Sequence, residues 1–204
     1  MTQHAMFDSP YPPSPGMYES DGLTSDISLL LCHGQSPDEI HTNLEDDFDP
    51  DELEDLRGEE PRPESLQDVI DIVVAEYRSR ISAPSPHALA LRQLSTALEE
   101  KSISFSFDEG YDKEEAAHFG HERAQDNGHA GYVYCTNQDV DGVLSTGTLY
   151  LGFSSTDGDP ESSVAIAAAA VDALRAVGLN PQWEGLATAR IQCDGFLYEV
   201  PVSD

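Results

Sequence analysis

The part of the sequence that most restricts the fold lies between Ile103 and Cys193, where short apolar stretches of two different periods follow one another. In the first stretch Ile103, Phe105 and Phe107 alternate with serines, which is the period of a strand with one buried face. Further strands are predicted at 131–136, 148–154, 182–184 and 189–193, and helices at 112–126 and 159–178. This alternation predicts an α/β (α+β) fold, with a mixed sheet of about four to five strands and packed helices.

The sequence ahead of this region predicts helices and a tail. Apolar residues between Leu66 and Ile81 recur on one helical face, and a second helix is predicted to begin at Ser85. A short apolar stretch followed by a capping serine and a first-turn proline predicts a small helical lead. The proline-rich start has too little apolar surface to offset its ordering entropy. The predicted organisation is a disordered tail at 1–22, a helical lead at 23–44, an acidic linker at 45–63 and an α/β domain at 64–204.

The predicted linker is the densest acidic part of a chain whose formal net charge is -29. Between Glu45 and Glu64 it holds eleven acidic residues against only Arg57 and Arg62. A field of this sign repels nucleic-acid phosphate and anionic lipid, so we expect neither direct nucleic-acid binding nor membrane binding. Solubility in a salty cytoplasm, attraction of a basic protein, and imitation of a nucleic-acid backbone all fit the composition. The residues predicted to bind a basic protein partner are Asp46, Asp47, Asp49, Asp51, Glu52, Glu54 and Asp55.

Cysteine usage and hydropathy bear on the compartment. Cys32, Cys135 and Cys193 are an odd number, widely spaced, and each lies among apolar residues. They are therefore predicted to be buried, reduced thiols. The longest apolar run, Val164–Val171, is too short to span a bilayer, and no basic region followed by an apolar stretch opens the chain. We expect a cytoplasmic protein.

One segment resembles the start of a calcium-binding loop. Asn137, Asp139 and Asp141 alternate ahead of Gly142, as calcium ligands do ahead of the turn glycine. The twelfth position of such a loop should be a bidentate glutamate, and here it is Thr148. We therefore interpret the segment as an Asx-rich turn joining two strands, without calcium.

A second group of residues could bind zinc through imidazole and thiolate. It consists of His118, His121, His129 and Cys135, of which the first two are spaced to share a helical face. Zinc motifs usually bring paired cysteines or a His-Glu-x-x-His helix, and neither is present in this sequence. We interpret these residues as surface histidines on a polar helix and expect no metal and no cofactor.

Sequence patterns of known catalytic sites are missing. The chain has no Gly-x-Ser-x-Gly elbow, no phosphate-binding glycine-rich loop with lysine and no dinucleotide fingerprint. The carboxylates between Asp108 and Glu115 are close together, as chance allows in a chain with 39 acidic residues. The favoured interpretation is a non-enzymatic binding or regulatory protein that contacts a basic protein partner. The alternative is an enzyme or a metal-dependent ligand-binding domain that uses residues between Asp108 and Asp141. The sequence leaves the oligomeric state open.

Three segments together resemble a known family. They are Gly131–Asp139, Gly147–Phe153 and Ala173–Gly185, and the resemblance extends over most of residues 64–193. The family is a bacterial one, classed only as a domain of unknown function. Its members often carry a Cys-Cys-x-x-Cys cluster after the strand equivalent to the one at Ile103, where this chain has Asp108–Asp112. The resemblance therefore implies a fold, and it implies neither an activity nor a metal site.

Overall fold

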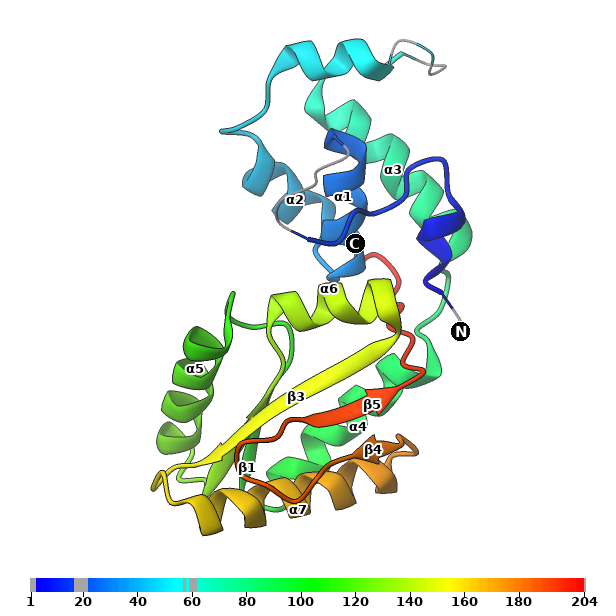
Figure 1. The fold of residues 1–204 in the computed structure, drawn as a ribbon. Helices are drawn as coiled ribbons and strands as arrows, with labels where there is room; N and C mark the ends of the chain where they lie inside the picture. Colours follow the sequence, from blue (N-terminus) through cyan, green and yellow to red (C-terminus); the bar gives the residue numbers. More distant parts are fainter. Residues whose placement is uncertain (1–2, 17–21, 57, 59–61, 204) are drawn as a thin grey trace. The chain divides into compact units, whose positions relative to one another are not determined.

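The protein forms two compact units in a computed structural model, which describes residues 3–16, 22–56, 58 and 62–203. Unit 1 is residues 86–197, and unit 2 combines residues 3–85 with residues 198–204 as far as they are described. Both units are α-helical in part, and the sheet belongs to unit 1 (Figure 1). Within the described residues the chain has seven α-helices and one five-stranded mixed sheet, which confirms the predicted α+β class.

The sheet of unit 1 has the strand order β1-β2-β3-β5-β4. The first two strands are parallel, and the remaining neighbours are antiparallel. The five strands are β1 (Ile103–Ser106), β2 (Gly131–Tyr134), β3 (Thr148–Ser155), β4 (Pro181–Gln182) and β5 (Ile191–Asp194). The helices of unit 1 are α4 (Pro86–Glu99), α5 (Lys113–Asp126), α6 (Asn137–Thr146) and α7 (Pro160–Ala176).

Helices α5 and α7 pack on opposite faces of the sheet. Successive residues of a strand point to opposite faces, so Gly131 and Tyr132 mark the two sides of β2. A Cβ atom at Gly131 would lie 2.6 Å from Ile166 of α7, whereas the Tyr132 ring contacts Gly120 of α5. The strand–helix layers are visible in Figure 1, with α5 on one side of the sheet and α7 on the other.

Unit 2 is a small helical assembly. Its helices are α1 (Leu23–Cys32), α2 (Pro37–Leu44) and α3 (Leu66–Arg80), with the short 3₁₀ helices η1 (Ala5–Asp8) and η2 (Pro50–Leu56). Helix α2 begins with the predicted cap, since the Ser36 hydroxyl accepts a hydrogen bond from the Glu39 amide and the Glu39 carboxylate accepts one in return. On α3 the apolar face is fully buried at Val69, Ile70 and Val73, as the helical periodicity predicts.

The N-terminal segment differs from the predicted disordered tail at 1–22. Residues 3–16 pack on unit 2, with Met6 fully buried and His4 2% exposed. The Ala5 amide donates to the carboxylate of Glu199 at 2.8 Å, which joins the two ends of the chain. The hydroxyl of Ser28 on α1 donates to the Tyr11 carbonyl at 2.7 Å. The prediction was wrong for 3–16 because these contacts are non-local, and residues 1–2 and 17–21 lie outside the described residues.

The predicted domain boundary at residue 64 is also displaced. Helix α3 belongs to unit 2, and the chain enters unit 1 only at Pro86. After Leu197 it returns to unit 2, where the Tyr77 hydroxyl donates to the Val200 carbonyl at 2.9 Å. The predicted linker at 45–63 contains η2, and its residues 57 and 59–61 lie outside the described residues.

The segment predicted to be a turn between two strands is helix α6. Thr136 and Asp139 form a capping box, and Gly147 ends the helix in the left-handed conformation with φ 69°. Val140, Val143 and Leu144 form its buried side. Among the described residues, no helix is long and apolar enough to cross a bilayer.

Candidate functional site

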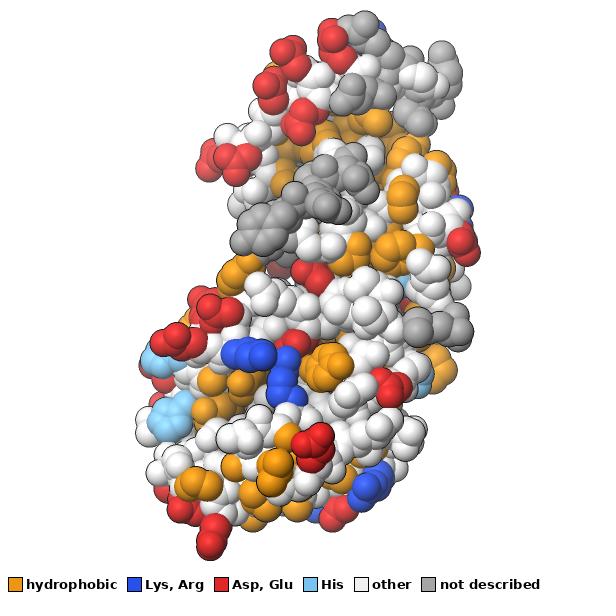
Figure 2. Space-filling view, in the orientation of Figure 1, with side chains coloured by type: hydrophobic (Ala, Val, Ile, Leu, Met, Phe, Trp, Pro, Cys, Tyr) orange, Lys and Arg blue, Asp and Glu red, His pale blue; other side chains and the backbone are white. Residues whose placement is uncertain are grey.

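A hollow on unit 1 runs along helix α5. It has a volume of about 660 Å³ and is open to solvent. We call it the α5 groove, and its lining residues are Asp112, Glu114, Glu115, Ala117, His118, His121 and Tyr132. In Figure 2 histidine and acidic side chains lie together along the flank of unit 1 that carries α5.

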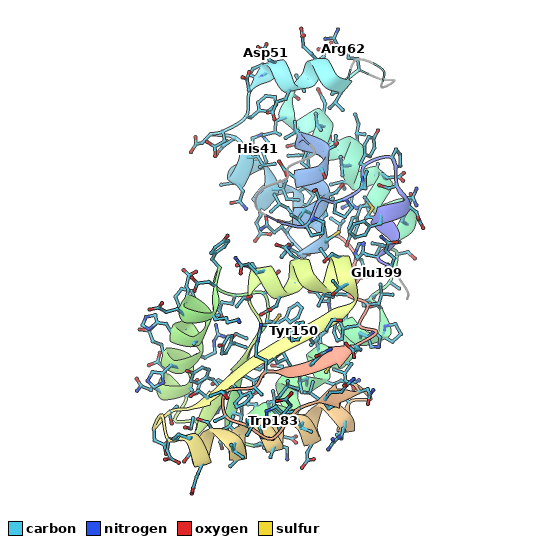
Figure 3. All side chains as sticks on the ribbon, in the orientation of Figure 1. His41, Asp51, Arg62, Tyr150, Trp183 and Glu199 are labelled. Carbon is cyan, nitrogen blue, oxygen red and sulfur yellow. The ribbon has the colours of Figure 1, made fainter. Side chains whose placement is uncertain are left out.

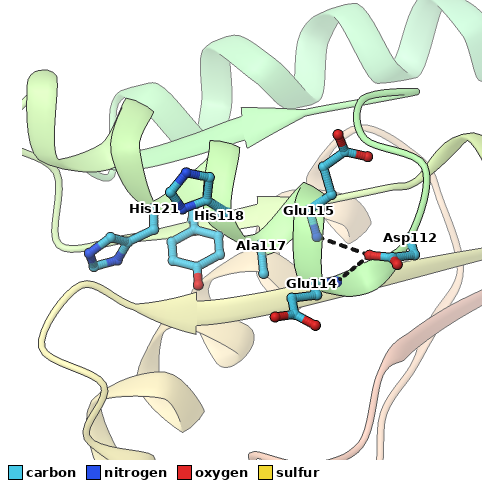
Figure 4. Close-up of a pocket in the computed structure, with 7 residues that line it drawn as sticks. Asp112, Glu114, Glu115, Ala117, His118 and His121 are labelled. Carbon is cyan, nitrogen blue, oxygen red and sulfur yellow. Dashed lines mark hydrogen bonds between the residues drawn. The ribbon is translucent and has the colours of Figure 1, made fainter.

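The groove wall follows from helical spacing. Glu114, Ala117, His118 and His121 are three or four residues apart, so they share one face of α5. Figure 4 shows Glu114 and Ala117 between Asp112 at one end and the two histidines at the other. The neighbouring face of the helix carries Ala116, Gly120 and Ala124, which are buried against the sheet. Small residues on that face let the helix lie close to β2.

The floor is the Tyr132 side chain of β2. Its ring lies against α5 so closely that a Cβ atom at Gly120 would be 2.6 Å from it. The ring meets the His121 ring edge-on at a centroid distance of 6.0 Å. Burial raises the pKa of the Tyr132 hydroxyl, although a hydrogen bond with the Ser154 side chain opposes that effect. The tyrosine therefore offers the groove an uncharged, rigid surface.

The acidic end of the groove is fixed by the cap of α5. One Asp112 oxygen accepts hydrogen bonds from the amides of Glu114 and Glu115, at 2.9 and 3.0 Å. The Glu115 carboxylate accepts a hydrogen bond from the Tyr111 amide at 2.6 Å. The Glu114 carboxylate, by contrast, accepts no hydrogen bond within the described part of the chain. Three acids and no lysine or arginine line the groove, so it attracts cations.

The loop that carries Asp112 is anchored by an ion pair. Both guanidinium nitrogens of Arg123 donate to the Glu109 carboxylate, at 2.7 and 2.6 Å. This bidentate contact raises the pKa of Arg123. It ties the β1–α5 loop to the last turn of α5 and so holds the groove end in place.

The four residues considered as possible zinc ligands do not come together. His118 and His121 line the groove, whereas the His129 ring lies 2.9 Å from the Ser104 hydroxyl after the end of α5. Cys135 is fully buried, and burial, followed by the charge of Asp139, raises the pKa of its thiol well above the usual range. Within the described residues, no three His, Cys, Asp or Glu side chains are arranged to hold a metal ion.

The three residues considered as possible calcium ligands lie on α6 and do not converge. Positions two apart on a helix point in different directions, so Asp139 is turned away from Asn137 and Asp141. The Asn137 amide donates to the Asp108 carboxylate at 2.7 Å. Asp139 instead accepts hydrogen bonds from Thr136 and from Arg190, whose Nη1 lies 2.7 Å from it.

The Asp139–Arg190 pair is partly buried, with side chains 10% and 21% exposed. Burial alone would raise the pKa of Asp139, but the hydrogen bond and charge of Arg190, with the Thr136 donors, hold it below its usual value. Arg190 also lies 5.6 Å from the ring centre of Tyr150, which Figure 3 shows on β3. This cluster ties α6 to the sheet and has a structural role.

The acidic residues predicted to bind a partner lie on and before η2. Two of them are engaged locally, because Asp49 accepts a hydrogen bond from the Asp51 amide and Glu52 accepts one from the Asp49 amide. Asp46, Asp47, Asp51 and Glu54 are exposed, and the side chain of Asp55 lies outside the described residues. Figure 3 labels Asp51 on this segment.

The groove itself was not predicted from the sequence. Its signal is a polar helix whose acidic first turn is followed by histidines at positions 118 and 121, with Tyr132 on the next strand. Only the contact between Gly120 and Tyr132 shows that this strand residue forms the floor. That contact depends on how closely α5 packs on the sheet, which periodicity does not specify.

The sequence model of a family described as "Domain of unknown function (DUF6891)" matches residues 19–199. The chain therefore belongs to that family, in agreement with the resemblance found in its sequence. No curated protein and no solved structure matches this sequence.

Proposed function

We propose, starting from a family whose description assigns no function, that this protein is a non-enzymatic binding protein whose α5 groove takes up a basic segment of a partner protein. The observation that carries the proposal is the combination of an acidic end and an apolar, aromatic floor in one open groove. A lysine or arginine side chain has matching parts, an aliphatic stem and a cationic head. The stem would lie on Ala117 and Tyr132, and the head would meet Asp112 and Glu114.

The structure of the groove favours binding over catalysis. Its lining contains no serine, threonine or cysteine that could act as a nucleophile. Its acidic residues are exposed, whereas catalytic carboxylates are usually tuned by burial. Two titratable residues nearby, the partly buried Asp139 and the buried Cys135, are engaged inside unit 1. The alternative of an enzyme working between Asp108 and Asp141 therefore has weaker support.

The proposed compartment is the cytoplasm. The three cysteines are free and buried, as the sequence predicts, and reduced thiols are typical of a reducing compartment. The net charge of -29 supports a basic protein as partner and opposes direct contact with nucleic acid. Exposed charges steer association, so binding should be fast and should weaken as salt rises.

The proposal is tested with a fluorescently labelled nine-residue peptide of alternating arginine and serine. Fluorescence anisotropy at low ionic strength gives its dissociation constant for the full chain. Glu114→Gln removes the groove carboxylate that accepts no hydrogen bond from the described residues. This variant should bind the peptide about fivefold more weakly, because one charge pair about 4 Å apart in water has a Coulomb energy of about 1 kcal/mol.

The matched control is Glu161→Gln. Glu161 is also in the first turn of a helix, α7, and it lies outside the groove. Its variant should bind as the natural chain does. A third variant carries Asn or Gln at all seven partner-binding positions predicted in the acidic run. If that variant does not bind the peptide while Glu114→Gln still binds it, the acidic run is the binding site. If neither the natural chain nor any variant binds the peptide, the proposed function is wrong.

A further inference from the structure

Two histidines share the α5 groove with the acids that would receive a cation. His118 and His121 are on the same helical face as Glu114, one and two turns further along α5. His121 is in edge contact with the floor residue Tyr132. His118 is 65% exposed, and its Nε2 lies 3.5 Å from the Glu122 carboxylate. Both imidazoles are open to protons from solvent.

Protonation would change the charge of the groove without moving its backbone. Histidine is the side chain that ordinarily gains or loses a proton between about pH 5 and pH 8. Neutral imidazoles leave the groove with its three carboxylates, whereas two imidazolium groups cancel most of that charge. The two imidazolium groups would also lie beside any cationic side chain that packs on the Tyr132 floor of the groove.

Other titratable groups surround the two histidines. On α5 and its cap these are Asp112, Glu114, Glu115 and Glu122, and on the sheet it is Tyr132. Carboxylates ordinarily titrate near pH 4, and burial moves the pKa of Tyr132 upward, away from neutrality. Among these residue types, histidine is the one whose charge ordinarily changes between about pH 5 and pH 8. Glu122 partly offsets the charge on His118, and no described acid is paired with His121 in the same way.

We infer that the α5 groove holds its basic partner only while His118 and His121 are neutral, and releases it on mild acidification. This inference rests on the proposed function of the groove. Two added charges at about 6 Å from the bound cation weaken binding about tenfold in a solvent-like dielectric. The effect is opposite to that of histidines in an anion-binding site, where acid would strengthen binding.

The test measures the same labelled arginine–serine peptide at about pH 8 and about pH 5.5, with ionic strength held constant. The full natural chain should bind about tenfold more weakly at the lower pH. The variant His118→Gln with His121→Gln should bind with equal affinity at both. Both side chains lie on the surface of α5, and circular dichroism at each pH verifies that the compared proteins are folded.

The matched control is His41→Gln. His41 on α2 is a half-exposed histidine, also in an i,i+4 pair with a glutamate, at 3.6 Å, and it lies in unit 2. This variant should keep the full pH dependence. If the natural chain binds equally at both pH values, or the double variant loses affinity as the natural chain does, the inference is wrong while the proposed function stands. If the peptide does not bind at about pH 8, the proposed function fails and the inference fails with it.

Discussion

Acid should destabilise unit 2 through a single buried histidine. His4 is 2% exposed, and its Nδ1 accepts a hydrogen bond from the Met6 amide at 3.3 Å. Its Nε2 has no hydrogen-bond partner among the described residues, and Nδ1 lies 3.7 Å from the Cys32 thiol. The Tyr77 ring lies 6.2 Å from the His4 ring, the Glu199 carboxylate is engaged by the Ala5 amide, and the Arg80 guanidinium donates to the Ala5 carbonyl. Burial lowers the pKa of His4 from 6.5 to about 4.

The size of the effect follows from the difference between the folded and unfolded states. The unfolded chain takes up the proton near pH 6.5, whereas the folded chain holds His4 neutral down to about pH 4. The unfolded state therefore binds more protons, and the free energy of unfolding falls as the pH falls through this window. The loss attributable to His4 is about 1.4 kcal/mol at pH 5.5 and about 3 kcal/mol at pH 4.

The measurement is urea unfolding, monitored by circular dichroism, at a series of pH values between about pH 4 and about pH 7. The variant is His4→Asn, whose side-chain oxygen can accept the Met6 amide bond and cannot gain a proton. Its free energy of unfolding should fall by about 3 kcal/mol less than that of the natural chain on going from pH 7 to pH 4. His41→Asn, at a half-exposed position in the same unit, should follow the natural chain.

Equal pH dependence in His4→Asn and the natural chain would refute the reasoning. It would mean that His4 is solvated or mobile, and that residues 3–16 do not hold the buried position described. Trp183, the single tryptophan, lies in unit 1, so its fluorescence follows that unit separately.

Three further outcomes are expected. Asp139→Asn should lower the free energy of unfolding by about 2–3 kcal/mol, because it leaves Arg190 partly buried without its counter-charge. Asp172→Asn removes one partner of an exposed ion pair and should change the free energy of unfolding by less than about 0.5 kcal/mol. Urea unfolding of both variants tests this. Gly152→Ala should lower the melting temperature, since its Cβ would lie 2.2 Å from the Tyr134 ring. Gly142→Ala should raise it, because a Cβ at this position of α6 would enter open space and alanine favours a helix. The three buried thiols, each with its pKa raised by burial, should react with a thiol reagent in urea and stay unreactive in the native protein near pH 8, as absorbance assays would show.

Elements with strong local signals were predicted well from the sequence. Helix α7 has an aspartate cap, a first-turn proline and regular apolar spacing, and all three act within the segment itself. Helix α6 was missed because its alternating acids and Gly142 also fit a turn. The capping box of Thr136 and Asp139 and the terminal Gly147 were the contrary signals.

Features that depend on distant contacts could not be read from local patterns. The segment around Met6 has no apolar periodicity, and it is ordered by contacts with α1, α3 and Glu199. The boundary at Pro86 was hidden because α3 and α4 have similar amphipathic patterns and are assigned to different units only by packing. The groove likewise depends on the contact between Gly120 and Tyr132. The sequence indicated surface histidines on a polar helix and did not indicate that contact.

The hydrogen bond between Ala5 and Glu199 constrains the order in which the two units can be completed during synthesis. Unit 1 is one continuous stretch, so all of its residues are available once Leu197 has left the ribosome. Unit 2 is interrupted by that stretch and needs residues from both ends of the chain. Its N-terminal segment must therefore wait, while more than half of the protein is made, for the Glu199 carboxylate that receives the Ala5 amide. Residues 3–16 are thus made before unit 1 and acquire all of their contacts only after it.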